Sequence, residues 1–101
     1  MKYVESNVDG QCVMKLSESL TFADHQAFRD MLKKLEDGQR KSCCFDISQL
    51  VSIDSAGLGM FLIAKDHSQQ NDWQMSIKGP QGQVGSVMKL AKFEDIFTIV
   101  G

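Results

Sequence analysis

The sequence predicts a single α/β domain comprising residues 1–101, with a mixed sheet of four to five strands and helices mainly on one face. Segments with the two-residue period of strands alternate along the chain with segments of helical period. Strands that alternate with helices imply parallel pairing through right-handed crossovers. The dipeptide Asp9-Gly10, a strong hairpin signal, predicts one antiparallel pair at the start. A chain of 101 residues is large enough to form one core.

The first part of the chain predicts a hairpin followed by a helix. We expect an edge strand over Lys2–Asn7 and, after the turn, a half-buried strand in which apolar and polar residues alternate. The apolar members of this second strand are Cys12, Met14 and Leu16. Thr21 to Asp24 resembles a capping box, with the acid three residues after the cap. The helix that follows should end at Asp37-Gly38; its apolar stripe is Phe28, Met31, Leu32 and Leu35.

The segment from Asp46 to Asp66 forms the centre of the predicted fold. The apolar run Cys43-Cys44-Phe45 favours a strand covered on both faces, which should end at Asp46 and lead through a short loop into a helix. That helix is expected to begin at Asp54-Ser55. Helical spacing predicts its core stripe, which consists of Leu58, Phe61, Leu62 and Lys65.

The last third of the chain predicts a strand, a helix and a final short strand. Asn71-Asp72 turns the chain into a strand over Gln74–Lys78, and Gly79-Pro80 ends that strand. A third helix is predicted from apolar residues at helical spacing, namely Val84, Val87, Met88 and Ala91. The final strand is expected over Phe97–Val100.

Ser55 is the main candidate functional residue. At a helix N-terminus, unpaired N–H groups and the macrodipole favour negative charge, so the fold can accept a phosphoryl group there. The alternative is that Ser55 is an ordinary helix cap. Gly57 and Gly59 favour a function, since each costs about 0.5–1 kcal/mol relative to Ala in a helix and lets another backbone or a partner approach. Met60 and Ile63 lie outside the predicted stripe and belong either to the core or to an exposed docking face.

The run from Phe45 to Gly59 resembles the signature of STAS domains, in particular the small bacterial anti-anti-sigma factors. In that family an apolar strand ending in Asp and a hydrophobic loop precede the sequence Asp-Ser-[small]-Gly-Leu-Gly, which opens a helix; here it is Asp54 to Gly59. The resemblance covers nearly the whole chain and implies the STAS element order ββαβαβαβ. It places the family's phosphorylated serine at Ser55.

The same resemblance implies a phosphorylation-switched binding module. When Ser55 is unphosphorylated, the module binds an anti-sigma factor, often itself a serine kinase; phosphorylation releases that partner, and a serine phosphatase restores binding. The expected partner-binding residues lie at the helix start and in the segment before the first helix. They are Asp54, Ser55, Ala56, Gly57, Gly59, Met60, Ser19 and Thr21. Whether Ser52 is a second phosphosite is left open.

Two other interpretations remain at this point. One is a STAS subunit of an ABC-type lipid transporter complex that binds its ATPase; such subunits often carry Thr at the switch position. The other is a structural oligomerisation domain in which Ser55 only caps the helix. The complete Asp-Ser-Ala-Gly-Leu-Gly sequence favours the phosphorylation switch over both.

The residues give little support to catalysis. Ile53 stands where a G-x-S-x-G nucleophile elbow needs its first glycine. His25 and His67 lie in helical contexts and are interpreted as ordinary surface or helix-end residues. No Cys/His grouping has zinc spacing. We therefore expect no enzyme activity, no metal and no cofactor.

Charge and cysteine usage restrict the partners and the compartment. A net charge of −2 provides no basic surface for nucleic acid. No apolar run approaches the ~20 residues of a membrane span, so no direct membrane insertion is expected, and the first residues do not resemble a signal peptide. Three cysteines, an odd number, argue against a disulfide framework and favour the reducing cytoplasm.

Overall fold

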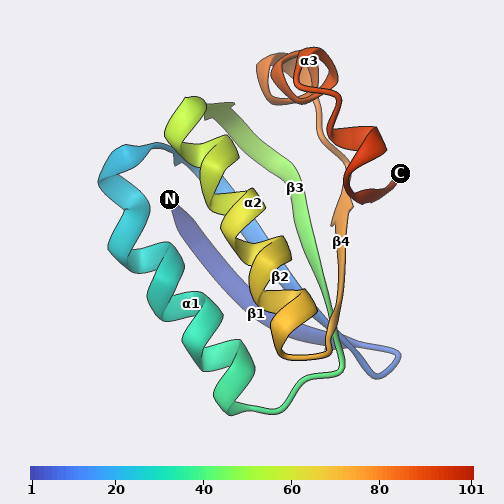
Figure 1. Cartoon of the computed structure of the whole chain (residues 1–101). Helices are drawn as coiled ribbons and strands as arrows, with labels where there is room; N and C mark the ends of the chain where they lie inside the picture. Colours follow the sequence, from blue (N-terminus) through green and yellow to red (C-terminus); the bar gives the residue numbers. More distant parts are fainter.

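One five-stranded sheet organises the fold, and the computed structural model describes all residues from Met1 to Gly101 (Figure 1). The strands lie in sequence order: β1 (Lys2–Val8), β2 (Gln11–Leu20), β3 (Ser42–Ile53), β4 (Gln74–Lys78) and β5 (Thr98–Val100). β1 and β2 are antiparallel, whereas β2 to β5 are parallel. The predicted mixed sheet with one initial hairpin is therefore confirmed.

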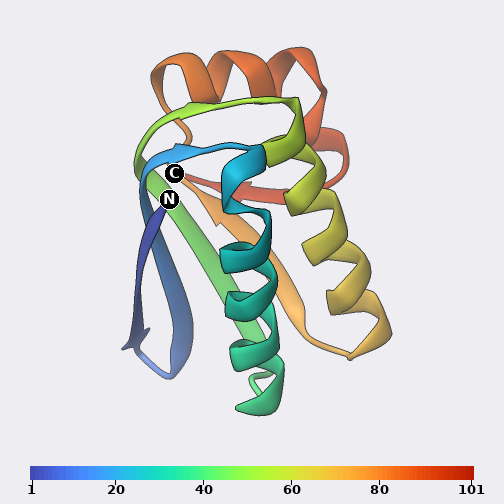
Figure 2. The same cartoon turned by 90° about the vertical axis from the view of Figure 1, so that its left-hand side faces the viewer.

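Two of the three helices cover one side of this sheet. When successive parallel strands are added in one direction, right-handed crossovers bring their helices to the same face. Figures 1 and 2 show α1 (His25–Asp37) and α2 (Ser55–Gln70) side by side over that face, while α3 (Gly82–Leu90) lies across one end of the sheet. Two short 3₁₀ turns, η1 (Phe22–Asp24) and η2 (Phe93–Asp95), precede α1 and β5. None of the helices combines the length and apolarity needed to span a membrane.

The main core lies between the sheet and the helices α1 and α2, and Phe45 of β3 is at its centre. Its ring lies 6.2 Å from that of Phe28 on α1 and 5.9 Å from that of Phe61 on α2, measured between centroids. Trp73, directly before β4, contacts the same ring at 6.4 Å. Aromatic contacts at these separations stabilise beyond the burial of their area. They tie both helices to the central strand.

Most predicted element boundaries are confirmed to within one or two residues. The predicted capping box forms, with the Thr21 N–H donating to Asp24 Oδ2 at 2.9 Å, but it begins η1 rather than α1 itself. α1 ends before Gly38 as expected, and α3 ends at Leu90, so Ala91 is its C-terminal cap.

The prediction that β3 ends at Asp46 is wrong, because the strand continues to Ile53. Its second half pairs with the end of β2 through two irregularities in the register. These irregularities place Ile47, Leu50 and Ile53 in the core at intervals of three residues. A spacing of three matches neither the period of a strand nor that of a helix, so the pattern alone predicts a loop.

The predicted inner face of α2 is also wrong by about one position. Met60 is only 2% exposed, whereas Leu62 is 44% exposed. The buried residues of α2 are Gly57, Met60, Phe61, Ala64 and Ser68. Met60 therefore belongs to the core, which corrects its assignment to the docking surface. Because residues 58 to 63 are nearly all apolar, their pattern does not determine which side of the helix faces the sheet.

All three cysteines are buried free thiols. Burial raises the pKa of the Cys43 thiol far above its usual value, and the adjacent Cys12 thiol raises it further. Burial also raises the pKa of Cys12. Because the thiolate is the reactive form, these side chains act as small core residues.

A pair of substitutions on α2 tests its orientation. Met60→Ala should lower the free energy of unfolding by about 2–5 kcal/mol, because it leaves a cavity in the core. Leu62→Ala should change it by no more than about 0.5 kcal/mol. Urea unfolding of the two variants provides the comparison, and equal losses would contradict this orientation.

Candidate functional site

Asp54, the residue before α2, is the N-cap of that helix. Its backbone is extended, and its Oδ1 accepts the N–H of Gly57 at 2.8 Å. Its Oδ2 accepts the N–H of Phe22 at 3.3 Å. One carboxylate therefore caps α2 and also holds the η1 turn against the helix start.

Ser55 is consequently free of a capping role. It is the first residue of α2, its side chain is exposed, and its hydroxyl makes no hydrogen bond within the chain. The N–H groups of Ser55 and Ala56 point out of the helix end, as the first N–H groups of any helix do. Ser55 thus presents an accessible hydroxyl where positive potential from the helix favours a negatively charged group.

Gly57 allows the start of α2 to approach the sheet closely. A Cβ at this position would lie 2.5 Å from the carbonyl oxygen of Leu20 and 2.6 Å from Cγ1 of Ile53. Both distances are too short for real atoms, so only glycine fits here. The close approach at Gly57 is therefore made to the ends of β2 and β3, and Gly57 is buried there, which corrects its place among the expected partner-binding residues. Gly59, in contrast, has open space at its Cβ position.

The end of β2 lies beside the Ser55 turn, as expected for Ser19 and Thr21. The N–H of Asp54 donates to the Leu20 carbonyl at 3.3 Å. The Ser19 hydroxyl is hydrogen-bonded to that of Ser52 at 2.7 Å, and both residues are half-buried. Thr21 donates its N–H to Asp24 in the capping box. The structure brings these residues together, but their polar groups serve mainly to hold the site.

The sequence predicts no functional role for the exposed apolar side chains of Phe22, Val51 and Leu62, whereas Ile63 is one of the two residues that it places either in the core or on a docking face. Phe22, whose N–H is bound by Asp54, is 72% exposed, and Val51 near the end of β3 is 71% exposed. On α2, Leu62 and Ile63 are also exposed. Leu62 lies seven residues after Ser55 and therefore on the same side of the helix. No local pattern in the sequence marks Phe22 as part of the site, because only the folding of η1 against the start of α2 brings it there.

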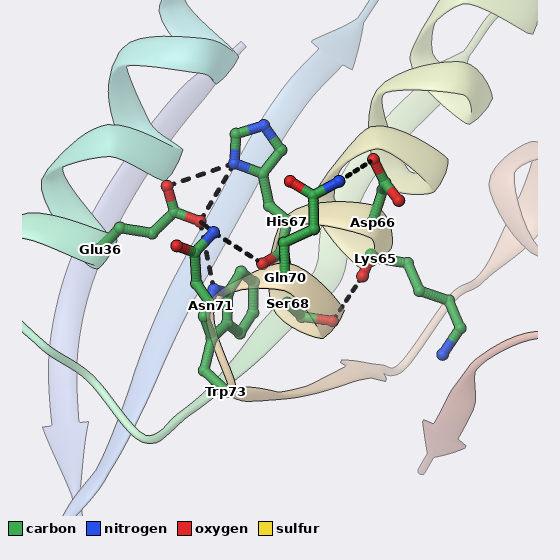
Figure 3. Close-up of polar contacts among 8 residues, drawn as sticks. All are labelled: Glu36, Lys65, Asp66, His67, Ser68, Gln70, Asn71 and Trp73. Atoms are coloured by element: carbon green, nitrogen blue, oxygen red, sulfur yellow. Dashed lines mark hydrogen bonds and ion pairs between the residues drawn. The ribbon is translucent and has the colours of Figure 1, made fainter.

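Neither histidine forms a hydrogen bond with Ser55. His67 lies twelve residues further along α2, which corresponds to about 18 Å at the helical rise. Its Nδ1 instead contacts Glu36 of α1 at 3.1 Å (Figure 3). The same carboxylate accepts hydrogen bonds from Asn71 and Trp73. This cluster ties the C-terminal ends of α1 and α2 to the start of β4.

The largest concavity, about 490 Å³, is lined by residues of the five strands and by none from α2. Its charged groups are Lys15, Asp46 and Lys78, which are neighbours across β2, β3 and β4. Burial alone would raise the pKa of Asp46, but hydrogen bonds from the hydroxyl and N–H of Ser48 hold it below its usual value. This surface is separate from the Ser55 turn.

The different structural roles of Asp54 and Ser55 can be tested by measuring the stability of variants. Asp54→Ala should lower the free energy of unfolding by about 0.5–2 kcal/mol, because it removes the cap and leaves the Phe22 N–H without an acceptor. Ser55→Ala should change it by no more than about 0.5 kcal/mol. Thermal or urea unfolding gives both values, and a larger loss for Ser55→Ala would show that its hydroxyl is structural.

Solved structures with this fold include proteins of different roles. An anti-sigma factor antagonist from Mycobacterium paratuberculosis is 12% identical, with a TM-score of 0.85 over 98% of this chain and 84% of the other. The antagonist SpoIIAA of Bacillus, solved unphosphorylated and phosphorylated, gives TM-scores of 0.73 and 0.72 at 14% identity; 99% of this chain and 87% and 92% of those chains are covered. A sulfate transporter family protein from Wolinella succinogenes gives a TM-score of 0.77 at 10% identity. The match covers 94% of this chain and 80% of the other.

Sequence comparison is more specific. A STAS-domain containing protein of Pseudomonas aeruginosa is 28% identical over 94 residues, which is 92% of each chain. The family model of the STAS domain matches residues 3–100, nearly the full length. The five-stranded mixed sheet and its helices also agree with the fold of the structural neighbours. The chain therefore belongs to the STAS domain family.

Proposed function

We propose that this protein is an anti-sigma factor antagonist, a non-catalytic binding module whose partner binding is switched off by phosphorylation of Ser55. The observation that carries the proposal is the exposed, unbonded hydroxyl of Ser55 at the first position of α2, where Asp54 already performs the capping. The presence of anti-sigma factor antagonists among the structural neighbours supports the same role.

The unphosphorylated protein docks through the exposed side of the α2 start. This surface combines Ser55, Gly59 and Leu62 of α2 with Phe22 of η1. Gly59 lets the partner approach the helix, and Phe22 provides a large apolar contact of the kind that dominates binding energy. Ala56, Ser19 and Thr21 line the adjacent turn. The surface keeps the position expected from the sequence, with Leu62 in place of Met60.

Phosphorylation acts on this surface through charge. A phosphoryl group adds about −1.5 to −2 charges near neutral pH. The N-terminus of α2 tolerates this charge within the folded domain. A partner surface that excludes water does not, particularly with the Asp54 carboxylate adjacent. The partner is an anti-sigma factor or a serine kinase of the switch type, and a serine phosphatase reverses the reaction.

A STAS subunit of a transporter complex is the second candidate, because a sulfate transporter family protein shares the fold. As the family resemblance implies, such a subunit would bind the ATPase of an ABC-type lipid transporter. The two candidates differ in the bound protein. Capture of a transporter ATPase by the purified chain, independent of Ser55 phosphorylation, would favour the second.

Ser55 should be the principal phosphorylated residue. Incubation with the cognate kinase and ATP should add one phosphate, measured by intact-protein mass, and Ser55→Ala should add none. Ser52 is a poorer substrate because its hydroxyl is half-buried and bonded to Ser19. Phosphate found instead on Ser52 or Thr21 would contradict the assignment.

Substitutions on the docking surface should separate binding from folding. Ser55→Asp, Gly59→Arg and Leu62→Glu should each weaken capture of the anti-sigma partner at least about tenfold, because each puts charge into a desolvated interface. Their melting temperatures should stay within a few degrees of wild type, since all three positions are open to solvent or to free space.

Leu90→Glu is the matched control, because Leu90 is an exposed leucine on α3, outside the proposed surface. It should bind like wild type. Equal loss in all four variants, or unfolding of Ser55→Asp, would rule out this surface.

A further inference from the structure

The end of β3 has a neighbouring strand on one side only. β2 follows it up to Ile53, whereas β4 pairs with it only from Ser42 to Asp46. The backbone groups of Ile53 that point away from β2 therefore need another partner. Unpaired backbone groups in a partly buried segment are costly, so such a partner is expected.

Gln83 of α3 supplies that partner with one side chain. Its Oε1 accepts the N–H of Ile53 at 3.0 Å, and its Nε2 donates to the Ile53 carbonyl at 3.1 Å. The amide thus replaces the peptide group of a missing strand. A primary amide carries both the acceptor and the donor that this arrangement uses.

The residue held by Gln83 determines the geometry around Ser55. Ile53 directly precedes Asp54, the cap that binds Gly57 and Phe22. Its side chain also packs against the first turn of α2, where a Cβ at position 57 would lie 2.6 Å from its Cγ1. A shift of the Ile53 peptide would therefore move the cap, the η1 turn and the first N–H groups of α2 together.

We propose that Gln83 is a positioning residue for the Ser55 switch: it fixes the Ile53 peptide and thereby the orientation of the helix start that carries Ser55. The effect on the switch rests on the proposed function of Ser55. The fixing of the Ile53 peptide by Gln83 does not depend on that function. α3 becomes part of the switch site without contributing to the docking surface defined above.

The test uses full-length protein with phosphoserine installed at position 55 during translation, so that no natural kinase is needed. The second pKa of that phosphate, followed by ³¹P NMR, reports the potential of the helix start, which favours the dianion and lowers the pKa. Gln83→Met keeps the side-chain length but removes both hydrogen bonds. It should raise this pKa by about 0.2–0.7.

Amide hydrogen exchange in the unphosphorylated protein provides the second readout. In Gln83→Met, exchange at Gly57 and Phe22 should accelerate at least about tenfold more than at core amides such as that of Leu32, because the opening is local. Gln81→Met is the matched control, since Gln81 is exposed and its side chain makes no capping hydrogen bond. It should leave both readouts unchanged.

Identical behaviour of the Gln83→Met and Gln81→Met proteins would overturn the proposal. If Gln83→Met does not fold, Gln83→Glu replaces it in the exchange experiment, because Glu keeps the acceptor for the Ile53 N–H and loses only the donor. Selective acceleration at Gly57 and Phe22 then supports the proposal, and uniform acceleration contradicts it. Failure of the proposed function is recognised separately: the cognate kinase would not label wild-type Ser55, whatever the Gln83 variants show.

Discussion

The close approach of α2 to the ends of β2 and β3 is the constraint on which the proposed docking surface depends. It is possible only because Gly57 has no side chain: a single carbon there would overlap the Leu20 carbonyl and the Ile53 side chain. Once Gly57 faces the sheet, helical geometry places Met60, Phe61 and Ala64 in the core. The same rotation turns Ser55, Gly59 and Leu62 towards solvent.

The orientation of α2 is held at both of its ends. At the start, the Asp54 carboxylate and the Gln83 amide fix the turn. At the other end, Glu36 of α1 accepts hydrogen bonds from His67, Asn71 and Trp73 (Figure 3). Between them, Phe61 packs against Phe28 and Phe45. A helix held in this way can present a modified residue without being reoriented by it.

In the function we propose, adjacent residues at the start of α2 serve folding and signalling. Asp54 caps the helix end and binds η1, so the interactions of this turn depend on a residue other than the proposed phosphorylation site. The Ser55 hydroxyl makes no hydrogen bond within the chain. In the proposed switch, adding a phosphoryl group to Ser55 changes the electrostatics of the surface and leaves the interactions that support it intact. The module we propose controls binding through charge rather than through unfolding.

The sequence by itself determined the α/β class, the hairpin, the order of elements and the place of Ser55 at a helix start, because those depend on local periodicity, turn residues and a contiguous motif. Tertiary structure decided the rest. Because β3 pairs with β2 through irregularities, its buried residues are spaced by three, and this spacing does not indicate a strand. The apolar run from Leu58 to Ile63 does not show which side of the helix is buried; the contact of Gly57 with the sheet decides it. Phe22 and Gln83 reach the site only because η1 and α3, distant in sequence, fold against it; contacts of that kind leave no local pattern to detect.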